Sequence, residues 1–69
     1  MDAAERRDLV GRLFADLTAK FEDAAMLAAE GQGPRQPPEQ LRSIAASIAQ
    51  HIAEARELTR QVTELLGQL

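Results

Sequence analysis

The sequence predicts an all-α protein, an antiparallel two-helix hairpin that we expect to dimerise into a four-helix bundle. The composition is rich in Ala, Leu, Glu, Arg and Gln, with no Trp, no Tyr and two Phe, and this profile is typical of helical and coiled-coil proteins. The only strong break is EGQGPRQPP, residues 30–38, where two glycines and three prolines interrupt any helix. On both sides of the break, apolar residues recur at helical spacing. The chain is therefore interpreted as one domain, 1–69.

The first helix is expected at about 2–30. Asp2 and Glu5 stand at the spacing of a capping box, in which each side chain binds the other residue's backbone N–H. Gly31 suits the left-handed position just beyond a helix end. The apolar stripe of this helix is wide and consists of Val10, Phe14, Leu17, Phe21, Ala24 and Ala28, flanked by Leu9, Leu13 and Leu27.

The second helix is expected at about 38–67, after a turn at 31–37. Pro38 suits the first helical position, because its missing N–H has no partner there, and Glu39 favours the positive end of the helix dipole. Gly67 should fray the end. The apolar stripe repeats every seven residues at Leu41, Ile48, Ala55, Val62 and Leu69, with flanking residues Ile44, His51, Leu58 and Leu65 on one side and Ala45, Ile52, Thr59 and Leu66 on the other.

The short connection predicts that the two helices pack antiparallel. If the turn is centred near residue 34, residues whose numbers sum to about 69 lie opposite each other. Phe14 then meets Ala55, a large residue against a small one. The hairpin core predicted in this way consists of Val10, Phe14, Leu17, Phe21, Leu41, Ile48, Ala55 and Val62.

A second copy is expected to complete the fold. A domain of this size rarely gains more than about 3 to 5 kcal/mol from one core, and the chain has no cysteine for disulfides. Helices of about 42 Å also leave apolar surface exposed in a lone pair. The expected solution is a homodimeric bundle with crossing angles near 20°. Its interface, with itself or with another helical protein, is predicted at Leu13, Leu27, Ile44, His51, Ile52, Leu58, Leu65 and Leu66.

His51, the only histidine, has three interpretations. It can be a polar seam residue that sets the register, a pH-sensitive packing element, or a metal ligand with Glu54. Di-iron bundles use Glu-x-x-His in two copies with further glutamates, whereas this chain has a single His-x-x-Glu. The structural interpretation is favoured, so no metal or cofactor is predicted. Whether His51 has a function stays open.

Four arginines, Arg6, Arg7, Arg56 and Arg60, should gather at the open end of the hairpin. They suggest a nucleic-acid surface as an alternative function. The net charge of −3 and the acidic residues one turn away favour ion pairs on a solvated face instead. No aromatic residue stands among them to stack on a base.

The leading functional prediction is a small, non-enzymatic regulatory or adaptor protein that acts through helix–helix contacts. No cysteine nucleophile is present, Ser43 and Ser47 lack an acid–histidine arrangement, and GQGP has neither the length nor the lysine of a phosphate loop. No apolar run approaches the roughly 20 residues that span a bilayer, and the N-terminus is polar, so a cytoplasmic protein without membrane contact is expected. The preference for Arg over Lys fits a GC-rich bacterial genome. The partner, the pathway and the orientation of the hairpins are left open.

Overall fold

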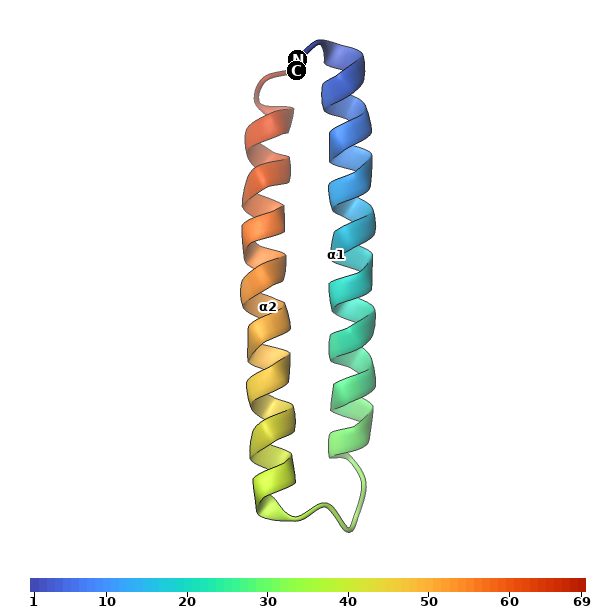
Figure 1. The fold of residues 1–69 in the computed structure, drawn as a ribbon, viewed down its shortest axis with the longest axis vertical. Helices are drawn as coiled ribbons and strands as arrows, with labels where there is room; N and C mark the ends of the chain where they lie inside the picture. Colours follow the sequence, from blue (N-terminus) through green and yellow to red (C-terminus); the bar gives the residue numbers. More distant parts are fainter.

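In a computed structural model that describes residues 1–69, the chain forms two antiparallel helices, α1 (Ala3–Gly31) and α2 (Pro38–Leu66). The helices lie side by side, with both termini at one end and the connecting loop at the other (Figure 1). The molecule is a rod of 52 × 14 × 12 Å. The prediction of an all-α hairpin is confirmed. Neither helix combines the length and the apolar character needed to cross a membrane.

The helix ends follow local chemistry with one difference from expectation. Asp2 caps α1, because its Oδ1 accepts a hydrogen bond of 2.8 Å from the N–H of Glu5. Gly31 is the last helical residue and is not left-handed, since no glycine has a positive φ. A Cβ at Gly31 would make an ordinary van der Waals contact, 3.7 Å from Cγ2 of Ile44, so the packing does not require glycine there. Pro38 begins α2, preceded by Pro37 in an extended conformation.

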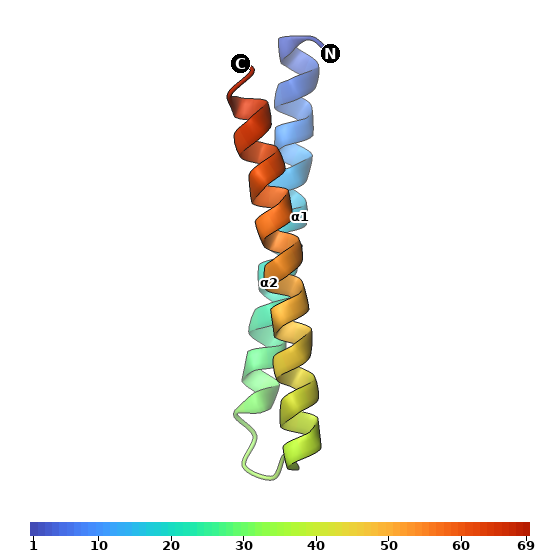
Figure 2. The same cartoon turned by 90° about the vertical axis from the view of Figure 1, so that its left-hand side faces the viewer.

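The two helices meet along a seam whose residues alternate in steps of three and four, the spacing of a coiled coil. We call these positions the hairpin seam. Figure 2 shows that the helices cross at a shallow angle. Val10, Leu13 and Leu17 of α1 are buried there, with Leu9, Leu58 and Leu65 packed against the cluster. The buried residues of α2 are Ile44, Ala55 and Val62.

The seam uses a different flank of α1 from the one that the sequence suggested. Phe14 and Phe21, assigned above to the hairpin core, are 50% and 54% exposed, so that assignment is corrected. Leu13, assigned to a partner interface, is buried inside the hairpin instead. The reason is the width of the stripe: Leu13 and Phe14 stand on opposite flanks of the line from Val10 to Leu17, and α2 can cover only one flank.

The register also differs from expectation. Lys20 pairs with Glu54, and Arg6 reaches the carbonyl oxygen of Gln68, so opposed residue numbers sum to 74 and not to about 69. The first turn of α2 extends beyond the end of α1 (Figure 1). Prolines explain this offset, because Pro34, Pro37 and Pro38 favour an extended loop over a tight turn.

Leu41 lies in this overhanging first turn of α2 and is 40% exposed, so it is outside the core to which it was assigned. The offset removes the helix that would have covered it. The expected pairing of Phe14 with Ala55 is also absent, since the observed register places Ala55 near the level of Lys20. Ala55 itself is buried, with 4% exposed.

Candidate interaction faces

The hairpin has two broad sides, and they differ in chemistry. In an antiparallel pair of helices, residues that occupy the same heptad position in the two helices lie on the same side of the hairpin. The reason is that reversing the direction of one helix also exchanges its left and right flanks. The residues that follow every second seam position therefore share one side. On this side all of them are exposed. We call it the apolar face, and its first row consists of Arg7, Phe14, Phe21 and Ala28 of α1 and Ala45, Ile52, Thr59 and Leu66 of α2.

A second row extends the apolar face outward. On α1 it contains only small residues, which are Ala4, Gly11, Thr18 and Ala25. On α2 it contains Arg42, Ala49, Arg56 and Thr63. None of the eleven acidic residues of the chain occupies either row. The only charges on this face are Arg42 and Arg56 of the second row and Arg7 of the first.

Large apolar side chains on this face are unusually open to solvent. Phe14, Phe21, Ile52 and Leu66 are 50%, 54%, 40% and 49% exposed. Scattered exposed apolar residues are ordinary, but a continuous patch along a whole molecule marks a contact surface. The apolar face is therefore the candidate interaction surface of the protein.

The eight residues predicted at a partner interface divide between the two locations. Ile52 and Leu66 lie on the apolar face. The other six lie in the hairpin seam, namely Leu13, Leu27, Ile44, His51, Leu58 and Leu65. Phe14 and Phe21 are the interface candidates that the sequence reasoning placed elsewhere. The signal that could have found them is a second heptad on α1, in which they alternate with Gly11, Thr18 and Ala25 without any charge.

The opposite side of the hairpin, which we call the polar face, is tied together by an ion pair. Lys20 of α1 binds Glu54 of α2 across the seam, and Nε2 of Gln50 donates to Oε1 of Glu54 at 3.0 Å. The hydrogen bond with Glu54 raises the pKa of Lys20, and the same bond, followed by that from Gln50, lowers the pKa of Glu54. This cross-helix pair occupies a seam position where the repeat calls for an apolar residue, and it therefore specifies the register.

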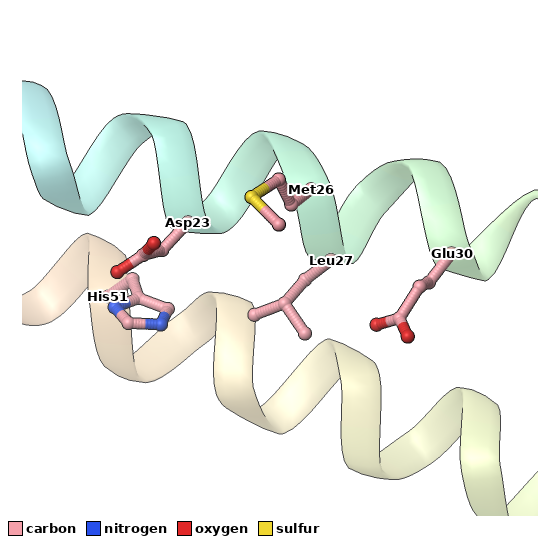
Figure 3. A pocket seen from close by; sticks show the side chains of 5 residues that line it. All are labelled: Asp23, Met26, Leu27, Glu30 and His51. Carbon is pink, nitrogen blue, oxygen red and sulfur yellow. The ribbon is translucent and has the colours of Figure 1, made fainter.

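His51 lies beside this pair in the seam of the polar face. It lines a shallow hollow with Asp23, Met26, Leu27 and Glu30, and Figure 3 shows Asp23 of α1 pointing toward the imidazole ring. Nδ1 of His51 is buried without a hydrogen-bond partner, because Oε2 of Glu54 is 4.0 Å away. No group of three or more His, Cys, Asp or Glu side chains is arranged to hold a metal ion. This geometry fits a polar seam residue.

We expect His51→Leu to stabilise the protein by about 1 to 2 kcal/mol, since it removes a buried nitrogen that lacks a partner. Urea denaturation of both proteins measures the difference, with Ala53→Leu on the exposed outer side of α2 as a control. A loss of stability would show that Nδ1 has a partner in solution. Added zinc should leave both melting temperatures unchanged; a rise seen only with His51 present would favour the metal-ligand interpretation.

The four arginines predicted as a nucleic-acid site do not form one cluster. Arg60 is held by Glu57, with bonds of 3.0 and 2.8 Å, and by Glu64 at 2.7 Å. Arg6 lies in the seam, with its Nε buried and Nη1 3.5 Å from the carbonyl oxygen of Gln68. Arg7 and Arg56 lie on the apolar face. Charge neutralisation at Arg60 and separation of the others leave no basic patch.

The Arg60 network gives the protein an acid dependence. Hydrogen bonds from Arg60 and then Gln61 lower the pKa of Glu57 from 4.5 to about 2. The stabilisation is therefore complete above pH 4.5 and is lost as the pH falls toward 2. Both side chains are more than half exposed, so solvent screening keeps the effect small. Urea denaturation between pH 6 and pH 2 should show that the free energy of unfolding falls less steeply with pH for Glu57→Gln than for the parent protein. Glu22→Gln removes a carboxylate that lacks an ion pair, so it should follow the parent. Equal slopes for all three proteins would contradict this assignment.

Comparison with protein-family models, with curated proteins and with solved structures finds no match to this chain.

Proposed function

We propose that the protein is a small, non-enzymatic regulatory or adaptor module that acts through helix–helix contacts, with a homodimeric four-helix bundle as its basic form. The apolar face carries this proposal. Only six of 69 residues are buried in the single hairpin, which is a small core for a stable domain. A second hairpin placed on the apolar face would bury Phe14, Phe21, Ile52 and Leu66 without burying an acidic group.

The size of the face supports a stable contact. Helices of 29 residues are about 43 Å long, and two adjacent helices are about 20 Å wide. The face therefore measures on the order of 800 Å², close to the roughly 800 Å² that each partner contributes to a typical stable complex. A second hairpin of equal length covers the whole of it, whereas a single helix would cover only the groove between α1 and α2.

The remaining surface supports a non-enzymatic role. The hollows on the polar face are shallow, and His51 forms no hydrogen bond with a serine or threonine hydroxyl that it could activate. Of the acids near it, Glu54 is paired with Lys20, and Asp23 points toward the imidazole ring (Figure 3). Nucleophilic catalysis needs a nucleophile and a base within hydrogen-bond reach.

A melting experiment tests the proposal. When unfolding is coupled to dissociation, the melting temperature rises with protein concentration. We expect a rise of several degrees over a hundredfold range of concentration, followed by circular dichroism. A melting temperature that is independent of concentration would contradict the dimer. The alternative nucleic-acid function predicts retarded RNA hairpins or duplex DNA in a low-salt mobility-shift assay, and we expect none.

A further inference from the structure

We infer that the partner on the apolar face is a second copy of the chain in the reversed orientation, with the two loops at opposite ends and α1 packed against the partner's α1. This inference rests on the proposed function and specifies its interface. Two face-to-face arrangements of hairpins are symmetric: one with the loops at the same end, which packs α1 on the partner's α2, and one with the loops at opposite ends.

The distribution of side-chain size along the apolar face favours the reversed arrangement. Near the loop, the two rows of both helices contain Ala25, Ala28, Ala45 and Ala49, and the one larger side chain there is Arg42 in the overhanging first turn of α2. Toward the termini the face is bulky, with Phe14 and Leu66 half exposed and Arg7 beyond them. The face is therefore thin at one end and thick at the other.

Loops at the same end would stack the thin end on the thin end. Ala28 would then meet the partner's Ala45, which leaves space unfilled, while the bulky ends would hold the helices apart. Loops at opposite ends stack thin on thick at both ends of the bundle. Large side chains then fill the space over alanine, as close packing requires.

Full overlap of two reversed hairpins fixes the pairing. On α1, residues whose numbers sum to about 35 meet, so Phe14 packs on the partner's Phe21 and Arg7 lies over the partner's Ala28. On α2, the corresponding sum is about 113, because opposed residues within one hairpin sum to 74, and this places Leu66 between the partner's Ala45 and Ala49. The two phenylalanines then lie near the centre of the interface, where the aromatic pair adds to the stabilisation from buried apolar area.

The charge distribution on α1 is compatible with the same arrangement. The two rows of α1 are uncharged from Gly11 to Ala28, so contact between the two copies of α1 buries no charge. The site of a Cβ at Gly11 has no atom within 4 Å, which allows close approach of another helix. Both arrangements cover Arg56, because loops at the same end place it against this stretch of the partner's α1, whereas loops at opposite ends place it next to the partner's Arg56.

Single cysteines test the orientation, because the chain has none of its own. In the reversed dimer, Thr18 lies next to the partner's Thr18 at the two-fold axis, so Thr18→Cys should oxidise to a disulfide-linked dimer within minutes. Gly11→Cys and Ala25→Cys should cross-link only when mixed. Ala53→Cys, on the outer side of α2, is the control that should not cross-link at equal concentration. Cross-linking of Thr18→Cys with Arg56→Cys, and not with itself, would overturn the inference in favour of loops at the same end.

A nitroxide label on Arg35→Cys, in the loop, separates failure of the orientation from failure of the dimer. Reversed hairpins predict a label separation comparable to the 52 Å length of the molecule, measured by pulsed dipolar spectroscopy. Loops at the same end predict about 20 Å or less, since neighbouring helix axes are about 10 Å apart; that result would overturn the orientation and leave the dimer intact. Absence of any dipolar coupling, together with a monomeric mass, would overturn both proposals.

Discussion

Phe21→Glu is expected to weaken self-association at least about 100-fold and to give a folded monomer at micromolar concentration. Phe21 is 54% exposed in the single hairpin, so the substitution leaves the seam untouched. In the dimer the new carboxylate would be buried at the centre of the apolar face without a partner, which costs several kcal/mol. Each 1.4 kcal/mol is a factor of ten in the dissociation constant.

Size-exclusion chromatography with light scattering measures this effect. Met26→Glu is the matched control, since Met26 is 70% exposed on the same helix but outside both rows of the apolar face. It should remain dimeric, with helix content unchanged in both variants. Equal dissociation constants for the two variants would show that the apolar face is not the contact surface.

Leu17→Ala is expected to abolish stable folding. Leu17 is 7% exposed at the middle of the hairpin seam, and removing a buried leucine side chain costs about 2 to 5 kcal/mol. That loss is comparable to the roughly 3 to 5 kcal/mol that a domain of this size gains from one core. Circular dichroism at 25 °C should show a large loss of helix.

Leu41→Ala provides the comparison for Leu17→Ala. Leu41 carries the same side chain but is 40% exposed in the overhanging first turn of α2. It should keep most of the helix signal and melt within a few degrees of the parent protein. If both variants lose the same stability, the register described for the seam is wrong.

The helices could be predicted from the sequence because the residues that start and end them act locally. Asp2 at the start, the Gly and Pro residues of 31–38 and the loss of periodicity near Gly67 act within one turn of the chain. The observed bounds, Ala3–Gly31 and Pro38–Leu66, lie within one residue of those expected. Only the conformation of Gly31 differed.

The seam and its register could not be predicted in the same way. The stripe of α1 is apolar on both flanks of Val10 and Leu17, and periodicity alone does not tell which flank meets α2 and which meets another molecule. Lys20 adds to the difficulty, since a lysine within an apolar repeat indicates that the repeat has ended. Here it lies in the seam and pairs with Glu54. The offset depends on how far the proline-rich loop extends, which no spacing encodes.

The candidate interaction surface follows from that choice of flank. Because α2 covers Leu13, the other flank of α1 stays exposed. Gly11, Phe14, Thr18 and Phe21 form a second uncharged heptad pattern on that flank, and α2 does not cover it. The sequence did predict that both helices need more than one neighbour. Six of the eight residues that it assigned to a partner interface lie in the hairpin seam, because the seam and the apolar face belong to one continuous stripe.

Sedimentation equilibrium tests most directly whether the apolar face joins two copies of the chain. The chain has a mass of 7.5 kDa. At micromolar concentration and neutral pH we predict a single folded species of about 15 kDa, twice the chain mass. A well-folded species of 7.5 kDa under the same conditions would contradict the account.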